Sequence, residues 1–403
     1  MTLNELQKKT LSTPCFIFDY AEFECSVKGF RQALDSQFRQ SSVGYSVKTN
    51  SLPYTIKEAK ALGCLAEVVS HDEYELAKEC GFTPCEIIYN GPMKSQETFL
   101  EAVKGGGIVN IETHRELQWL HLLPTDKQYE VGLRLNINIS EVSPDDADGK
   151  EDNSRFGFSD ETKEFVNAIH AIAALKNVRL AGLHIHRTAH SRSLNFYHHS
   201  VAYACQVIQK YNLDLDYLDV GGGYFGIFPN KPTFQEYSET FAQVLSQNGL
   251  SHLHVIVEPG NALVASCFSF ISEVIDVKHV EKDRWFVTTD GSRNDVDPFF
   301  HKTGYLFEIL SEHEGEVAKE QIITGCTCLE YDRLFTITNK PLLQVGDRIL
   351  YNNVGAYTMC LSPLFIRYFP NIYVINEETL SLIREKWGAK EFLQKSRNMK
   401  YEE

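Results

Sequence analysis

The chain has 403 residues, of which 43% are apolar, and its formal net charge is −15. This length is ample for two domains with substantial cores, and the acidic balance disfavours nucleic acid or an anionic membrane as a main partner. No apolar run reaches membrane-spanning length, and the ten cysteines lack the spacing of a disulfide framework, so we expect a protein of the reducing cytoplasm.

Up to about Asn261, short apolar runs alternate with amphipathic stretches. The runs expected to form strands are Val43–Val47, Leu65–Val69, Glu86–Tyr89, Ile108–Ile111, Glu130–Asn136, Val178–His184, Asp216–Val220 and Leu253–Val257. Apolar residues at three- and four-residue spacing predict helices between them, among these Pro53–Leu62, Asp72–Cys80, Glu97–Val103 and Glu161–Ala173. Eight such units favour an α/β fold with a closed TIM-type (β/α)8 barrel over an open doubly wound sheet, because eight is the number that closes the barrel.

The pattern changes after Asn261, where strand-like runs follow one another with few helical stretches between them. The clearest of these runs are Phe268–Val280, Trp285–Thr289, Gln321–Thr324 and Arg348–Val354. They predict a separate, mostly β domain. One further strand, Thr13–Asp19, precedes the barrel and is compatible with either domain.

Catalytic groups of barrel enzymes lie where strands end and loops begin, and the first strand ends in Tyr45-Ser46-Val47-Lys48. Lys48 is compatible with an ordinary lysine at the barrel rim, whose charge stays in water. It is also compatible with a Schiff-base lysine, whose amine must be near-neutral and directed into a pocket.

The sixth strand ends in His184-Ile185-His186, and residues two apart on a strand face the same side. Two such rings can be structural, can chelate zinc, or can stack on a flat ligand ring.

Two further strand ends carry polar or backbone groups suited to one ligand. Gly221–Gly223 follow the seventh strand, where barrels commonly bind phosphate through backbone N–H groups, although a plain flexible turn would look the same. Glu258 ends the eighth strand, and a carboxylate at that depth needs a partner such as a protonated ring nitrogen. An aldehyde for lysine, a phosphate for glycines, a ring for histidine and a ring nitrogen for glutamate are the four features of pyridoxal phosphate (PLP).

Seven motifs occur along the chain in the order Tyr45–Asn50, Ser154–Gly157, Gly182–His186, Gly221–Gly223, Glu258–Gly260, Cys328–Asp332 and Gly355–Tyr357. In this order they resemble the motifs of fold-type III PLP decarboxylases, which include diaminopimelate, ornithine and carboxynorspermidine decarboxylases. The resemblance implies an alanine-racemase-like barrel over residues 28–262 and a β domain built from residues 1–27 and 263–403.

The resemblance also implies roles for individual residues. The implied cofactor-binding residues are Lys48, His186, Gly221, Gly222, Gly223, Glu258, Gly260 and Tyr357. Lys48 and Cys328 are the implied catalytic residues, and they would meet across a head-to-tail homodimer. A buried structural thiol, or a Cys-x-Cys metal pair with Cys326, is the alternative for Cys328; we expect no metal.

The chain departs from the family pattern where the family binds substrate. Asn261 replaces an arginine, and Leu329 replaces the acidic residue that follows the cysteine. Asp297 and His301, together with Tyr357, are the expected substrate-binding residues, and these departures argue against meso-diaminopimelate. Asp297 suits a cationic or hydroxyl-bearing distal group.

Two further features bear on the substrate and on the cofactor phosphate. Arg187, Arg192 and Arg293 would suit an anionic distal group of the substrate rather than a cationic one, and the sequence leaves both options open. Thr188 or Ser191 is expected to replace the Gly-Ser pair with which the family often contacts the phosphate.

We therefore expect PLP-dependent decarboxylation of an amino acid or an amino-acid-derived metabolite. One alternative is a PLP-dependent amino-acid racemase, which normally avoids a carboxylate at the ring nitrogen, so Glu258 speaks against it. The other is a non-catalytic regulator that retains the fold, and the presence of both Lys48 and Cys328 speaks against that.

Overall fold

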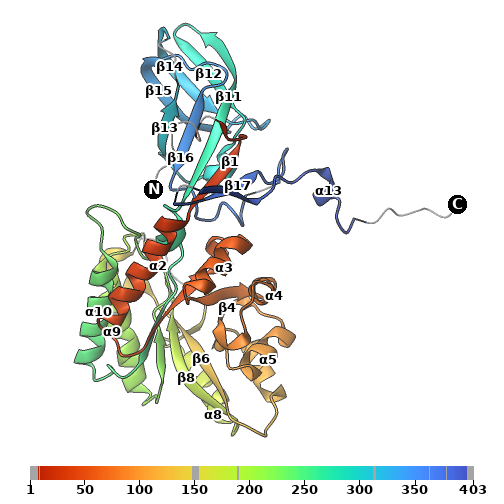
Figure 1. The fold of residues 1–403 in the computed structure, drawn as a ribbon. Helices are drawn as coiled ribbons and strands as arrows, with labels where there is room; N and C mark the ends of the chain where they lie inside the picture. Colours follow the sequence, from red (N-terminus) through yellow and green to blue (C-terminus); the bar gives the residue numbers. More distant parts are fainter. Residues whose placement is uncertain are drawn as a thin grey trace, which may run out of the picture. The chain divides into compact units, whose positions relative to one another are not determined.

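The computed structural model describes residues 8, 10–147, 154–187, 190–311, 315–362, 364–377 and 379–396. The chain divides into two compact units, which Figure 1 labels by element. One unit is Glu24–Leu263, and the other joins Met1–Phe23 to Val264–Glu403. Among the described residues, no helix has both the length and the apolar character needed to cross a membrane.

The unit Glu24–Leu263 is a closed parallel barrel, as predicted. Its strands are β2 (Ser41–Ser46), β3 (Leu65–Ser70), β4 (Ile87–Met93), β5 (Ile108–Ile111), β6 (Tyr129–Asn136), β8 (Val178–Ile185), β9 (Tyr217–Asp219) and β10 (His254–Val257). Each strand pairs with the next, and β10 pairs with β2 to close the ring. A two-residue strand, β7 (Phe158–Ser159), adds to β6 from outside the ring.

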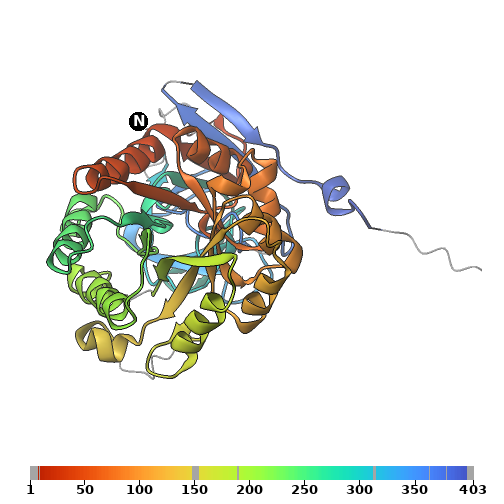
Figure 2. The ribbon, with the colours of Figure 1, turned by 90° about the horizontal axis from the view of Figure 1, so that it is seen from below.

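Helices surround the barrel strands in the view along the barrel (Figure 2). They are α2 (Tyr20–Asp35), α3 (Pro53–Ala61), α4 (His71–Glu79), α5 (Gln96–Lys104), α6 (His114–Trp119), α7 (Ile139–Val142), α8 (Glu164–Ala173), α9 (Leu194–Lys210) and α10 (Phe234–Gln247). Serine or threonine caps begin several of them; Thr233 Oγ1, for example, accepts the N–H of Glu236. Helix α8 begins three residues later than predicted, and the hydroxyl of Thr162 accepts the N–H of Glu164 there.

The barrel interior is filled by side chains, and Gly132 and Gly182 make room for Tyr217. Tyr217 packs with Ile88, Ala181 and Ile256 in one buried cluster. A Cβ atom at Gly182 would lie 2.0 Å from the Tyr217 ring, so only glycine fits there. The packed interior confines ligand chemistry to the strand ends.

The second unit is mostly β, as predicted, and the strand Thr13–Asp19 belongs to it. Its strands are β1 (Cys15–Asp19), β11 (Phe268–Glu281), β12 (Arg284–Thr289), β13 (Leu306–Leu310), β14 (Val317–Thr324), β15 (Arg333–Pro341), β16 (Arg348–Asn352), β17 (Asn371–Asn376) and β18 (Thr379–Arg384). Strand β1 lies between β11, with which it runs antiparallel, and β17, with which it runs parallel. Short helices α11 (Asn261–Val264), α12 (Arg293–Val296) and α13 (Ala389–Phe392) complete the described elements after β10.

Candidate active site

Lys48 lies in a short 3-10 turn, η1 (Val47–Thr49), directly after β2. Its side chain is 32% exposed, whereas the side chain of Glu67 on β3 is fully buried. Lys48 Nζ donates to both oxygens of Glu67, at 2.6 and 2.8 Å, and Ser46 Oγ donates to Glu67 Oε2 at 2.6 Å. The turn therefore directs the amine onto a buried carboxylate.

The pKa of Lys48 reflects burial and two neighbouring carboxylates. Burial alone would lower its pKa, but the nearby carboxylates of Glu67 and Glu258 outweigh burial and raise the pKa. In this structure Lys48 is thus paired with Glu67, and its predicted role as a Schiff-base lysine stays untested. A reaction of the amine with an aldehyde requires that it first lose a proton.

Glu258 follows β10 directly and is 4% exposed. Asn90 Nδ2 donates to Glu258 Oε1 at 2.5 Å and also to Glu67 Oε1 at 3.2 Å, so one amide links the two carboxylates. Burial would raise the pKa of Glu258, but His184 and Lys48 outweigh burial and hold it below its usual range. Glu258 is therefore an anion at the barrel's strand ends.

The rings of His184 and His186 lie nearly parallel, 18° apart, with centroids 6.3 Å apart, as their two-residue spacing predicts. His186 Nδ1 accepts the N–H of Gly222 at 3.0 Å, which puts any proton of the neutral ring on Nε2. Desolvation, with the charges of Lys48 and Arg134, holds the pKa of His186 well below its usual value. Because Nδ1 accepts a hydrogen bond and Nε2 carries the proton, the ring has no free lone pair for zinc, whereas its flat face can still stack on a ligand ring.

His184 is buried, and neither of its ring nitrogens makes a hydrogen bond within the described residues. Its Nε2 lies 3.5 Å from Glu258 Oε2.

The glycines after β9 and β10 let the ends of β2, β8, β9 and β10 approach one another closely. A Cβ atom at Gly221 would lie 2.6 Å from His186 Nδ1, and one at Gly222 would lie 2.3 Å from the carbonyl oxygen of Glu258. At Gly260 it would lie 2.3 Å from the hydroxyl of Thr49. Gly221 also has a φ of +70°, which favours glycine.

Two of the three glycines predicted to bind phosphate already donate their backbone N–H groups to neighbouring side chains. The N–H of Gly221 donates to Asp219 Oδ1 at 2.9 Å, and that of Gly222 donates to His186. In this arrangement Gly223, whose φ is +101°, is the remaining member of the triplet that can offer its N–H to an anion. Of the two predicted substitutes nearby, Thr188 lies outside the described residues, and Ser191 donates to Asp146 Oδ1 at 2.5 Å.

Asp297 belongs to the β unit, and its carboxylate is buried and fully engaged by its own loop. The donors are Arg293 Nε and Nη2, the backbone N–H groups of His301 and Lys302, and the hydroxyl of Tyr305, at 2.9–3.3 Å. These contacts give Asp297 an organising role in the loop. Its predicted contact with substrate stays untested.

His301 and Tyr357 are joined through Phe299 in one aromatic cluster of the β unit. The rings of Phe299 and His301 stack with centroids 5.8 Å apart, and Phe299 meets the Tyr357 ring edge-on at 5.1 Å. Phe299 is 47% exposed, and Tyr357 has a φ of +65°, which is unusual for an aromatic residue. Two of the predicted substrate-binding residues are thus brought together.

Cys328 is exposed, and it lies in the β unit beside a cavity of about 320 Å³ that Cys326 also lines. Its loop is held by the buried carboxylate of Asp332, which accepts the Thr327 hydroxyl at 2.6 Å and the Ser292 hydroxyl at 3.1 Å. The alternative of a buried thiol is therefore wrong for Cys328.

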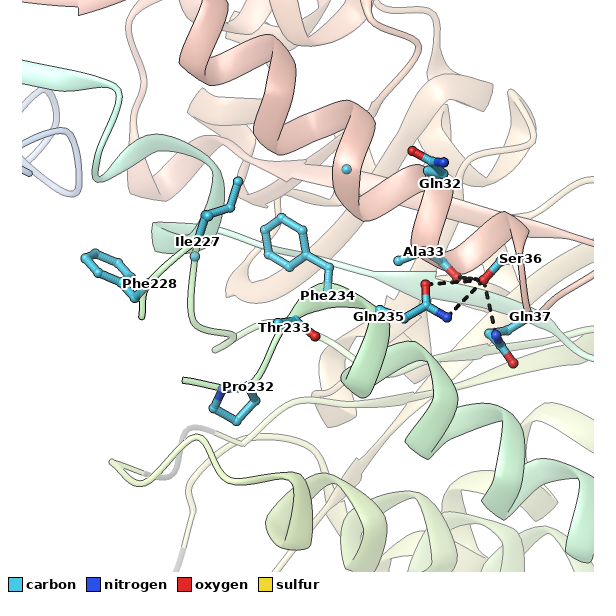
Figure 3. Close-up of a pocket in the computed structure, with 12 residues that line it drawn as sticks. Gln32, Ala33, Ser36, Gln37, Ile227, Phe228, Pro232, Thr233, Phe234 and Gln235 are labelled. Atoms are coloured by element: carbon cyan, nitrogen blue, oxygen red, sulfur yellow. Dashed lines mark hydrogen bonds between the residues drawn. The ribbon is translucent and has the colours of Figure 1, made fainter. Parts of the chain in front are cut away.

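A larger cavity of about 440 Å³ lies between α2 and the start of α10 (Figure 3). Its polar edge is formed by Ser36, whose hydroxyl meets the amides of Gln37 and Gln235. None of the predicted site residues lines it, so it is separate from the strand-end site.

Several buried polar residues of the strand-end site were not predicted: Glu67 on β3, Asn90 on β4, Asn110 on β5 and Asp219 on β9. Asn110 Nδ2 donates to Asn90 Oδ1 at 2.9 Å and to Asp219 Oδ2 at 3.4 Å, so these residues form one network. The available signal was a polar residue inside each otherwise apolar strand.

Residues 22–265 match a family model described as "Pyridoxal-dependent decarboxylase, pyridoxal binding domain". A probable chloroplastic diaminopimelate decarboxylase of Oryza sativa subsp. japonica is 26% identical over 91% of this chain and 76% of that protein. Antizyme inhibitor 1 of Mus musculus is 25% identical over 77% of this chain and 72% of that protein. A crystal structure of diaminopimelate decarboxylase from M. jannaschii superposes with a TM-score of 0.86 at 20% identity, covering 98% of this chain and 94% of the other.

Proposed function

Because the chain belongs to the family of pyridoxal-dependent decarboxylases, we propose that it releases CO₂ from an amino acid, or from a metabolite derived from one, other than meso-diaminopimelate. The observation that carries the proposal is the buried anionic carboxylate of Glu258 at the strand ends, beside the amine of Lys48. A buried anion of this kind stabilises a protonated ring nitrogen.

The strand-end residues fit PLP. Gly221, Gly222 and Gly260 let the strand ends converge where any Cβ atom would overlap a neighbouring strand end. Both nitrogens of buried His184 lack a hydrogen-bond partner within the described chain. Lys48 would hold the aldehyde carbon, Glu258 the ring nitrogen, and His186 one face of the ring. Gly223 would offer its N–H to the phosphate, with Tyr357 as a further candidate from the β unit.

Bound PLP supplies an electron sink for the electron pair that departing CO₂ leaves on the substrate carbon. Glu258 keeps the ring nitrogen protonated, which strengthens that sink. Glu67 lies within hydrogen-bond distance of Lys48 and pairs with its ammonium group whenever the amine is not bonded to the cofactor. Glu258 also argues against the racemase alternative, since racemases normally avoid a carboxylate at this nitrogen.

The proposed substrate differs from meso-diaminopimelate because the chain departs from the family pattern where the family binds substrate. Asn261, which begins α11, stands where the family has arginine. The acidic candidate Asp297 is engaged by its own loop, so it supports a cationic distal group less than its sequence position suggested. Relatives at about 25% identity share the family without fixing the substrate.

Cys328 is the proposed donor of a proton to the substrate carbon, and the proposed enzyme is a homodimer with shared sites. The support is the family resemblance of Cys328–Asp332, together with the exposure of the thiol.

The decisive experiment measures CO₂ release from a panel of cationic, anionic and neutral amino acids by PLP-loaded protein, with Lys48→Ala as the control. We expect turnover with at least one substrate, and loss of both turnover and borohydride-trapped cofactor in Lys48→Ala. Equal trapping in the variant would refute the role of Lys48.

A second candidate function is non-catalytic regulation, which the similarity to a protein named antizyme inhibitor 1 favours. PLP binding without CO₂ release across the whole panel would favour this function.

A further inference from the structure

Three buried groups lie together where β8, β9 and β10 end. They are His184, Asp219 and Glu258, and one ring nitrogen and one oxygen of each carboxyl group lie within 4.8 Å of one another. Asp219 is completely buried, and the other two are nearly so. Two carboxyl groups this close in a water-poor interior cannot both be ionised at low energetic cost.

The lysine and the arginine of the surrounding network are committed to other carboxylates. Lys48 pairs with Glu67, and Arg134 pairs with Glu112 at 2.6 Å. The side-chain donor that reaches Asp219 is an amide, Asn110 Nδ2, at 3.4 Å. An amide at that distance compensates a buried negative charge only weakly.

The two carboxyl groups differ in their surroundings. Glu258 receives the amide of Asn90 at 2.5 Å and faces His184 Nε2 at 3.5 Å. Asp219 receives the backbone N–H of Gly221 at 2.9 Å and the longer contact from Asn110. The negative charge is therefore better compensated on Glu258 than on Asp219.

On this geometry we propose that Asp219 carries a proton and donates it in a hydrogen bond toward Glu258, so that the pair holds a single negative charge, on Glu258. Burial and the charge of Glu258 raise the pKa of Asp219 well above its usual value, which agrees with this assignment. Other acidic groups that face the pair are Glu67, Tyr217 and Tyr224, and the pKa values of both tyrosines are raised well above their usual value.

The consequence rests on the proposed function. Asp219 is a positioning residue, since it acts on the ring nitrogen only through Glu258. With Asp219 neutral, the charge that stabilises the ring nitrogen is confined to one carboxylate instead of being shared.

The test is infrared spectroscopy of the full-length protein without cofactor, at about pH 8.5. At that pH Glu73 and Asp295, whose pKa values burial raises to about 7 and about 6, are mostly ionised. Wild type should show the carbonyl stretch of a protonated carboxylic acid, and Asp219→Asn should lose it. The matched control is Glu67→Gln, which removes an ion-paired carboxylate and should leave the band in place.

If Asp219→Asn does not fold, isotope labelling gives the same answer in wild type. Carboxyl-¹³C aspartate should shift the band, and carboxyl-¹³C glutamate should not. A band that is absent, that survives Asp219→Asn, or that follows glutamate labelling would overturn the proposal.

A second readout separates this inference from the proposed function. With ¹⁵N-labelled PLP, Asp219→Asn should keep the protonated ring-nitrogen signal, because the amide still offers an N–H to Glu258. Asp219→Ala removes the donor and should bind PLP roughly tenfold more weakly than Asp219→Asn. If wild type binds no PLP, the proposed function fails, and the infrared result still decides where the proton resides.

Discussion

At Gly222, one added methyl group should weaken cofactor binding while the protein still folds. A Cβ atom there would lie 2.3 Å from the carbonyl oxygen of Glu258, whereas ordinary contacts begin near 3.4 Å. The neighbouring backbone cannot easily yield, because the N–H of Glu258 donates to the carbonyl of Gly221 at 2.7 Å. In Gly222→Ala, therefore, the ends of β9 and β10 must move apart, and the Glu258 side chain must move with them.

The overlap of the added methyl group with the Glu258 carbonyl sets the expected loss of PLP affinity. Overfilling a packed site costs about 1–3 kcal/mol. If that cost falls on the cofactor-bound form, PLP affinity drops by roughly 5- to 150-fold. The matched control is Gly226→Ala, in the segment that follows, where the nearest atom would lie at 3.1 Å and a small adjustment suffices.

Equilibrium dialysis gives the PLP affinity of both variants, and thermal unfolding checks that they fold. We expect Gly226→Ala to bind PLP within about twofold of wild type and Gly222→Ala to bind it at least about fivefold more weakly. If Gly222→Ala binds PLP as tightly as Gly226→Ala, the strand-end cradle does not hold the cofactor.

Three further outcomes are expected. Glu258→Gln should retain much of its PLP but lose most turnover, since glutamine stabilises a protonated ring nitrogen far less; near-normal turnover would remove the main argument against a racemase. Mixing inactive Lys48→Ala and Cys328→Ala proteins should restore roughly a quarter of wild-type sites if subunits exchange and the site is shared in a homodimer, and exchange without activity would exclude that shared site. Lys94→Met leaves the fully buried carboxylate of Glu116 without its cation and should lower the free energy of unfolding in urea by about 3–5 kcal/mol. Removing Lys78 from its more exposed pair with Glu101 should cost at most about 1 kcal/mol, and equal costs would contradict the role of burial.

The barrel was predictable from the sequence because each strand carries its own local signal. An apolar run such as Ile108–Ile111 is bounded by turn residues, and its length alone separates it from a helix. The same reasoning selected Lys48, His186 and Glu258 as candidates, since a polar residue at the end of a buried strand needs a partner.

The network beneath those residues was harder to predict, because its members lie inside strands. Asn90 and Asn110 are polar residues in apolar runs, and only the closed barrel brings their amides together at 2.9 Å. The partner of Lys48 was not predicted for the same reason, since Glu67 follows it by 19 positions and reaches it only through the pairing of β2 with β3.

The role of Asp297 shows a different limit. A carboxylate in a loop near a matching motif suggested ligand binding, but hydrogen bonds from its own loop, including one from the backbone N–H of His301, occupy both of its oxygens. Spacing along the chain does not reveal which way such a side chain turns.

The place of β1 between β11 and β17 has a consequence for the order in which the protein is made. Residues 15–19 leave the ribosome long before their pairing partners, which lie at residues 268–271 and 371–375. At roughly 5–20 residues per second, β17 is synthesised tens of seconds after β1, and by then the whole barrel sequence has already emerged. Nascent chains should therefore contain a folded barrel attached to an apolar β strand with unpaired edges, and that strand is where a chaperone would be expected to bind during synthesis.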